Sequence, residues 1–154
     1  METVRQHVVM TGASRGFGQV TVGDLAARGW RVICGSREAP PPSCPRDPAQ
    51  GIHIAADLSK PDDVELFIKQ ANEVLGDDPL HALVNNAGVS PKTPYKERLG
   101  CLNGDIEAWR DVFELNFFTP LTLSRGFAAA LHRGKRALCN ITSLACHFLH
   151  PFCG

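Results

Sequence analysis

The chain has 154 residues, 44% of them hydrophobic and 21% charged, and its sixteen basic and sixteen acidic side chains cancel to a formal net charge of zero. This length and composition are typical of one folded domain, and the absence of a basic run argues against nucleic acid as a partner. No secretory signal opens the chain, and polar residues and a proline break the uncharged stretch 137–154, so we expect a cytoplasmic protein that neither spans nor binds a membrane.

Apolar runs and helical periodicity alternate along the chain and are separated by glycines and prolines. Ser59 is expected to cap the second helix, with Pro61 in its first turn. The alternation predicts an α/β fold, a Rossmann-type doubly wound parallel sheet that is truncated after its fifth strand. In chain order we expect a strand over 6–12, a helix over 14–29, a strand over 30–36, a loop over 37–51, a strand over 52–58, a helix over 59–76, a strand over 80–88, a loop over 89–104, a helix over 105–132 and a strand over 137–143.

In such sheets, ligands bind beyond the carboxyl ends of the strands. The first of these ends reads TGASRGFG and places Gly12, Gly16 and Gly18 between a strand and a helix. Glycines let the turn tighten and let the main chain approach a pyrophosphate, whose charge then lies at the positive N-terminus of the helix. The context therefore favours a nucleotide site over a plain tight turn.

Two further motifs lie at other strand ends: NNAG over 85–88, and Ser143 after the fifth strand. Together with the G-x-x-x-G-x-G spacing of the first turn, their order and spacing resemble the short-chain dehydrogenase/reductase family. The resemblance extends from about His7 to the last residue. It implies that residues 1–154 form a single NAD(P)-binding Rossmann domain, incomplete at its C-terminus.

The resemblance also implies roles for the matching positions. Asn116 and Ser143 would take two of the family's four catalytic positions, with the serine hydroxyl polarising the substrate carbonyl. From the residues alone, three alternatives stay open: Asp57 as a helix cap, Asn85 as a turn former and Ser143 as a loop residue. The implied cofactor-binding residues are Thr11, Gly12, Ser14, Arg15, Gly16, Phe17, Gly18, Ser36, Arg37, Asp57, Leu58, Asn85, Asn86, Ala87 and Gly88.

The end of the second strand bears on the choice between NAD(H) and NADP(H). NAD users usually place an acid there to bind the ribose 2′-hydroxyl, whereas this chain has Ser36 followed by Arg37. This chain therefore has no carboxylate at this position that would repel a 2′-phosphate. Arg15 in the glycine-rich turn adds a second positive charge. The sequence thus favours NADP(H), although surface arginines are common.

Asn116 also has a physical argument of its own, since Pro120 lies four residues later in the same predicted helix. Proline cannot donate to the carbonyl at position i−4, so the main-chain oxygen of Asn116 is expected to be free. In the family this oxygen holds a water of the proton relay. An ordinary proline kink with a hydrated carbonyl is the alternative.

The family's proton donor, a tyrosine followed four residues later by a lysine, has no counterpart in this sequence. Tyr95 is followed at that spacing by Leu99, and no lysine follows Lys135. General acid assistance is worth on the order of a hundred- to ten-thousand-fold, so hydride transfer by this chain is expected to be slow. Without the later elements of the family fold, the fifth strand is expected to be an exposed apolar edge.

The sequence therefore predicts the cofactor-binding part of an oxidoreductase whose full-length form moves a hydride between NADP(H) and a small carbonyl or alcohol substrate. The alternatives are a non-catalytic nucleotide-binding or interaction protein and a truncated product without function. Self-association into a homo-oligomer stays open.

The six cysteines form no C-x-x-C pair, and Cys34 and Cys139 are expected to be buried free thiols within strands. A second group of thiols and imidazoles lies near the end of the chain, with the spacing of no common zinc finger, so no metal site is expected. Its members are Cys146, His147, His150 and Cys153.

Overall fold

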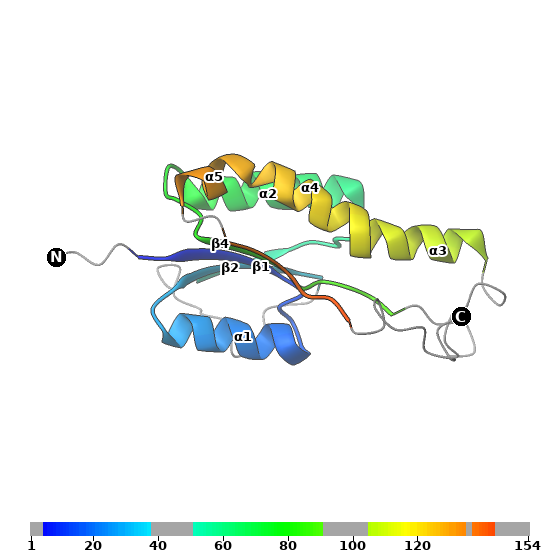
Figure 1. The fold of residues 1–154 in the computed structure, drawn as a ribbon, viewed down its shortest axis with the longest axis horizontal. Coiled ribbons are helices and arrows are strands. Elements are labelled where there is room, and N and C mark those ends of the chain that lie inside the picture. Colours follow the sequence, from blue (N-terminus) through cyan, green and yellow to red (C-terminus); the bar gives the residue numbers. More distant parts are fainter. Residues whose placement is uncertain (1–4, 38–50, 91–104, 135–136, 144–154) are drawn as a thin grey trace.

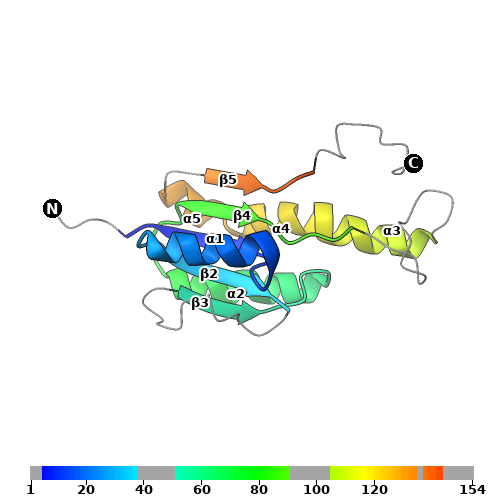
Figure 2. The same ribbon diagram turned by 90° about the horizontal axis from the view of Figure 1, so that it is seen from below.

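The computed structural model describes residues 5–37, 51–90, 105–134 and 137–143. Its strands form one parallel sheet in the order β3-β2-β1-β4-β5, with β5 at the outer edge (Figure 2). The order reverses direction beside β1, so crossovers lead to both sides of the sheet. The strands are β1 (His7–Thr11), β2 (Arg31–Ser36), β3 (Gly51–Ala55), β4 (Ala82–Asn85) and β5 (Ala137–Asn140).

Helices cover both faces of this sheet, as Figure 1 shows. One face carries α1 (Gly16–Ala27), and the other carries α2 (Pro61–Leu75), α4 (Thr119–Gly126) and α5 (Ala128–Arg133). The remaining helix, α3 (Ile106–Phe113), extends beyond the carboxyl ends of the strands. The predicted doubly wound α/β fold is confirmed.

The two faces bury separate apolar clusters because successive side chains of a strand point to opposite sides. Toward α1, Met10 and Cys34 pack with Val22 of the helix. Toward α2 and α4, the neighbouring positions Val9 and Ile33 belong to a larger cluster. That cluster is centred on two aromatic rings, Phe67 and Phe127, which meet edge to face at 6.3 Å.

The start of α2 differs from the prediction. Lys60, not Ser59, is the N-cap residue, and its side chain makes no capping bond. The Ser59 hydroxyl and main-chain N–H instead both donate to Oδ1 of Asp57, at 2.8 and 3.3 Å, and this Asx-type turn leaves Ser59 one position before the N-cap. Pro61 lies in the first turn as expected.

The long helix expected over 105–132 is interrupted. A π-helical segment, η1 (Glu114–Phe118), separates α3 from α4, and a second break at Phe127 separates α4 from α5. The main-chain N–H of Thr119 donates to the carbonyl of Glu114, five residues back, immediately before Pro120. Proline removes a donor from the regular ladder, and a π-turn is a common local response.

At the outer edge of the sheet, the structure confirms the prediction for the fifth strand and contradicts the prediction that Cys139 is buried. All four residues of β5 are exposed, and Leu138 keeps 50% of its surface accessible, which confirms the expected apolar edge. Cys34 is buried as predicted, but Cys139 is exposed because no described element covers β5.

Several predictions concern residues outside the described ranges: most of the two loops, Tyr95, and the group Cys146, His147, His150 and Cys153. Within those ranges, no three His, Cys, Asp or Glu side chains cluster as a metal site would require. Nor does any helix of the described part have the length and hydropathy needed to cross a bilayer.

Candidate functional site

A cavity of about 390 Å³ opens at the carboxyl ends of β1 to β4. Twelve of the residues proposed from sequence as cofactor ligands line it: Gly12, Ser14, Arg15, Phe17, Gly18, Ser36, Arg37, Asp57, Leu58, Asn86, Ala87 and Gly88.

The glycine-rich turn is built by contacts between β1 and the NNAG segment. The Thr11 hydroxyl accepts hydrogen bonds from the main-chain N–H groups of Asn86 and Ala87, at 3.1 and 3.0 Å. In the opposite direction, the Asn86 side chain donates to the carbonyls of Thr11 and Gly12, at 3.0 and 3.1 Å. The two strand ends are thereby joined into one rigid wall of the cavity.

Two glycines are required by this close packing. Gly12 has a φ of +68°, and a Cβ there would lie 2.8 Å from Nδ2 of Asn86. A Cβ on Gly18 would overlap the carbonyl oxygen of Gly12 and lie 2.7 Å from the same Asn86 nitrogen. The first turn of α1 can therefore approach the end of β1 only without side chains at these positions.

Within the part of the chain that the structure describes, no side chain caps the N-terminus of α1. Its N-cap residue, Arg15, is extended and makes no capping bond, whereas Asp105 caps α3 by accepting from the N–H of Ala108 at 2.7 Å. The first N–H groups of α1 are thus available at the positive end of a twelve-residue helix. This is the arrangement that binds an anionic group.

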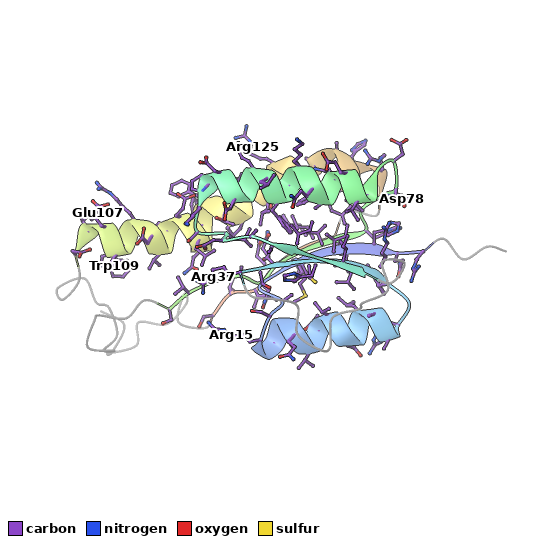
Figure 3. The ribbon with its side chains drawn as sticks, turned by 180° about the vertical axis from the view of Figure 1, so that it is seen from behind. Arg15, Arg37, Asp78, Glu107, Trp109 and Arg125 are labelled. Atoms are coloured by element: carbon purple, nitrogen blue, oxygen red, sulfur yellow. The ribbon has the colours of Figure 1, made fainter. Side chains whose placement is uncertain are left out.

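Among the described residues, the charged groups that line the cavity are two arginines and two aspartates. Arg15 and Arg37 come from α1 and the end of β2 and lie at the same end of the molecule, opposite Asp78 (Figure 3). Asp57 and Asp111 line the cavity as well. The pKa of Asp57 lies below its ordinary value, mainly because the Ser59 hydroxyl donates to the carboxylate, with a smaller contribution from Arg37.

Ser36, at the end of β2, is buried and hydrogen bonded to a histidine of the next strand. Its Oγ lies 2.8 Å from Nε2 of His53 in β3, and Ser36 keeps only 5% of its surface exposed. Partial burial lowers the pKa of His53, since an apolar environment disfavours the charged imidazolium.

The proposed catalytic residues are not among the residues that line the cavity. Asn116, in η1, holds Val89, which does line the cavity, through hydrogen bonds of 2.9 and 2.8 Å to the main-chain N–H and carbonyl. Ser143 is exposed, three residues after β5.

Three predicted cofactor ligands also fall outside the lining. Thr11 and Asn85 are buried, and Asn85 donates to Oδ1 of Asn140 at 2.9 Å. Gly16 is exposed and has a φ of +56°. Their contact with a cofactor stays a prediction.

Sequence reasoning missed five lining residues. Ala56, Ser59 and Val89 adjoin predicted ligands, so their place next to strand ends was the available signal. Asp111 and Leu115 come from the α3–η1 segment, and only the tertiary packing brings that segment over the cavity.

Comparisons with known proteins agree with this geometry. The family model for short chain dehydrogenases matches residues 6–152. Protein FixR of Bradyrhizobium diazoefficiens is 37% identical over 148 residues, which are 96% of this chain and 53% of that protein. Serine 3-dehydrogenase of Agrobacterium fabrum is 27% identical over 96% of this chain and 56% of its own. The chain thus spans about half the length of the curated relatives it matches.

Solved structures show the same fold. An oxidoreductase of the short chain dehydrogenase/reductase family from Brucella ovis, in complex with a partially ordered NAD, superposes with a TM-score of 0.85 at 40% identity, over 97% of this chain and 68% of the other. A metagenomic short-chain oxidoreductase in complex with NADP has a TM-score of 0.74 at 28% identity, over 92% of this chain and 63% of the other.

Proposed function

Because the chain belongs to the short-chain dehydrogenase family, we propose that it binds a nicotinamide dinucleotide, NADP(H) in preference to NAD(H), as the cofactor-binding part of an oxidoreductase. The full-length protein would move a hydride between that cofactor and a small carbonyl or alcohol compound. We place its action in the cytoplasm.

The observation that carries this proposal is the glycine-rich turn at the uncapped N-terminus of α1. Gly12 and Gly18 leave no room for side chains, and no side chain of the described residues caps the N–H groups of the first turn. These features fit a pyrophosphate, since main-chain donors can approach it closely and the helix end carries a partial positive charge. The adjacent cavity of about 390 Å³ has room for part of a dinucleotide.

The preference for NADP(H) is supported by the charges at the end of β2. Ser36 and Arg37 line the cavity there, where an acidic residue would accept hydrogen bonds from a ribose 2′-hydroxyl. Arg15 lies at the same edge. Arginine binds phosphate through two parallel hydrogen bonds and keeps its charge at every physiological pH. The solved relatives bind either cofactor, one in complex with NAD and one with NADP.

The bound cofactor would supply the hydride, and this chain's residues would position the reactants. In this proposal Ser143 donates a hydrogen bond to the substrate oxygen, and the main-chain carbonyl of Asn116 holds a water of the proton relay. Pro120 has no N–H to donate to that carbonyl. The sequence has no Tyr-x-x-x-Lys motif, so we expect the 154-residue chain to turn over carbonyl substrates barely above background.

Thermal unfolding with each reduced cofactor tests the binding proposal. A ligand at a hundred times its Kd stabilises the folded state by about 2.7 kcal/mol, so NADPH should raise the Tm by several degrees and NADH by less. Arg37→Asp should erase the difference, because a carboxylate repels the 2′-phosphate. Arg125→Asp, on α4 and away from the cavity, is the matched control and should keep it (Figure 3). Equal shifts for both cofactors in the unmodified chain would refute the preference.

A further inference from the structure

The turn that leads from β3 to α2, residues 56–60, uses nearly all of its main-chain N–H groups. Four of them donate to oxygens of the turn itself, of β2 or of α2; they belong to Ala56, Asp57, Ser59 and Lys60. Among the residues that the structure describes, no oxygen accepts from the N–H of Leu58. This turn therefore has one main-chain donor left for a ligand.

Two contacts fix the position of Leu58. Its side chain is buried and belongs to the apolar cluster under α2 and α4. Its carbonyl accepts a hydrogen bond of 2.7 Å from the hydroxyl of Thr119, the first residue of α4 and 61 positions away. A threonine within a helix commonly donates to a carbonyl of its own preceding turn, so this bond to another element is a specific connection. With its side chain and carbonyl both held, Leu58 also keeps its N–H in a defined position.

The residues around this connection line the cavity. Asp57 and Leu58 belong to the lining, and so does Leu115, four residues before Thr119. Oδ1 of Asp57 accepts from both the hydroxyl and the N–H of Ser59, whereas no described group donates to its Oδ2. The turn thus offers a ligand in the cavity two hydrogen-bonding groups on adjacent residues, one N–H donor and one carboxylate acceptor.

This pair of groups complements one edge of adenine. Adenine has an acceptor, N1, beside a donor, its 6-amino group, so the Leu58 N–H and the Asp57 carboxylate can bind both at once. Hypoxanthine has the opposite arrangement, an N1–H beside a 6-oxo group, which would place donor against donor and acceptor against acceptor. A site built in this way rejects the wrong base, because its own polar groups are then left without partners.

We propose that Thr119 is a positioning residue for the cofactor's base: its hydroxyl holds the Leu58 carbonyl and thereby aligns the Leu58 N–H and the Asp57 carboxylate with N1 and the 6-amino group of adenine. The proposal rests on the nicotinamide dinucleotide site proposed above. Thr119 is buried, is not among the residues that line the cavity, and acts through Leu58. Recognition of the base at the end of β3 therefore depends on a hydroxyl of α4.

Binding of two cofactors to the full 154-residue chain tests this role. NADPH and reduced nicotinamide hypoxanthine dinucleotide phosphate differ only in the purine, so the ratio of their Kd values, measured by calorimetry, isolates the contribution of the base edge. In the unmodified chain, the hypoxanthine form should bind at least about tenfold more weakly. Thr119→Val should lower this ratio by about threefold to tenfold, because NADPH loses affinity while the hypoxanthine form, which does not use the aligned groups, changes little.

Two further variants separate positioning from a merely structural role. Thr119→Ser keeps the hydroxyl and loses only a methyl group, so it should restore most of the ratio. Ser124→Ala is the matched control, because it removes a hydroxyl of the same helix that donates to the Pro120 carbonyl, and it should leave the ratio unchanged. Equal weakening of both cofactors in Thr119→Val, or no rescue by serine, would overturn the proposal.

A measurement on the unmodified chain does not depend on a folded variant. Saturation with NADPH should move the Leu58 amide proton downfield and slow its exchange with solvent, and the hypoxanthine form should do neither. An unchanged Leu58 amide, or equal affinity for the two cofactors, would contradict the inference. If neither NADPH nor NADH binds, the proposed function fails as well. If the chain discriminates between the bases and Thr119→Val retains that discrimination, only the role of Thr119 fails.

Discussion

Asn116 binds both polar groups of the Val89 main chain: its Oδ1 accepts from the N–H at 2.9 Å, and its Nδ2 donates to the carbonyl at 2.8 Å. The two residues are 27 positions apart, one in the π-helical segment η1 and the other directly after the NNAG segment. These two hydrogen bonds hold Val89, which lines the cavity, against η1.

Asn116→Ala should loosen that wall. Both Val89 groups lose their partner, at a cost of about 1 kcal/mol for each hydrogen bond. Hydrogen exchange of the Val89 amide should therefore accelerate severalfold, and NADPH should bind about fivefold more weakly. Asn72→Ala is a matched control, because it removes a side-chain bond to the Gly126 carbonyl away from the cavity. Unchanged exchange at Val89 would show that the contact does not hold the loop.

Thr11→Val tests the junction between β1 and the NNAG segment. The substitution keeps the side-chain volume but removes the oxygen that accepts from two N–H groups, at a site with 1% exposure. Buried donors without partners cost about 1–3 kcal/mol, so the free energy of unfolding in urea should fall by at least that amount. Thr11→Ser keeps the oxygen and loses only a methyl group, so it should cost less. The opposite order would mean that packing, not hydrogen bonding, stabilises the turn.

The stability of the Asp57 turn should depend on pH. The Ser59 hydroxyl holds the pKa of Asp57 below its ordinary value of 3.8, so the folded state favours the carboxylate. The resulting stabilisation is fully present above that value and is lost as the pH falls through the lowered pKa of the folded state. Ser59→Ala should raise the pKa of Asp57, which can be followed by the carboxyl ¹³C shift. The difference in the free energy of unfolding between the variant and the parent chain should become smaller in acid.

Ser124→Ala is the control for this titration, because its hydroxyl donates to the neutral carbonyl of Pro120. Its effect on unfolding should not vary over the same acidic range. If the pKa of Asp57 is the same with and without the Ser59 hydroxyl, the proposed cause of the shift is wrong.

The exposed edge strand predicts aggregation. Leu138 in β5 is half exposed, and no described strand pairs with the outer edge of β5. Leu138→Lys should reduce light scattering on storage with little change in Tm, since a charge on an edge strand opposes pairing with a second chain. Val20→Lys on α1, where Val20 is 72% exposed, is the comparison and should have a smaller effect. Equal effects would attribute aggregation to general surface hydrophobicity.

Much of the site could be predicted because the carboxyl ends of parallel strands lie at one edge of the sheet. The glycine spacing and the NNAG segment each follow an apolar strand, so Gly12, Gly18 and Ala87 could be assigned to one cavity before any coordinates. The hydrogen-bond partner of Ser59 was harder to predict. The Ser59 hydroxyl can donate to the Asp57 carboxylate or accept from an N–H at the start of α2, and only the folded structure shows that it does the first.

The sequence by itself determined the order of strands and helices and the glycine turn, because these depend on periodicity and on the backbone chemistry of a few residues. Only the tertiary structure decided three hydrogen bonds: from Asn86 to the carbonyl of Gly12, between Asn116 and Val89, and between His53 and Ser36. Each of these contacts joins separate elements. Their partners follow from strand register and helix packing, which one segment of sequence does not specify.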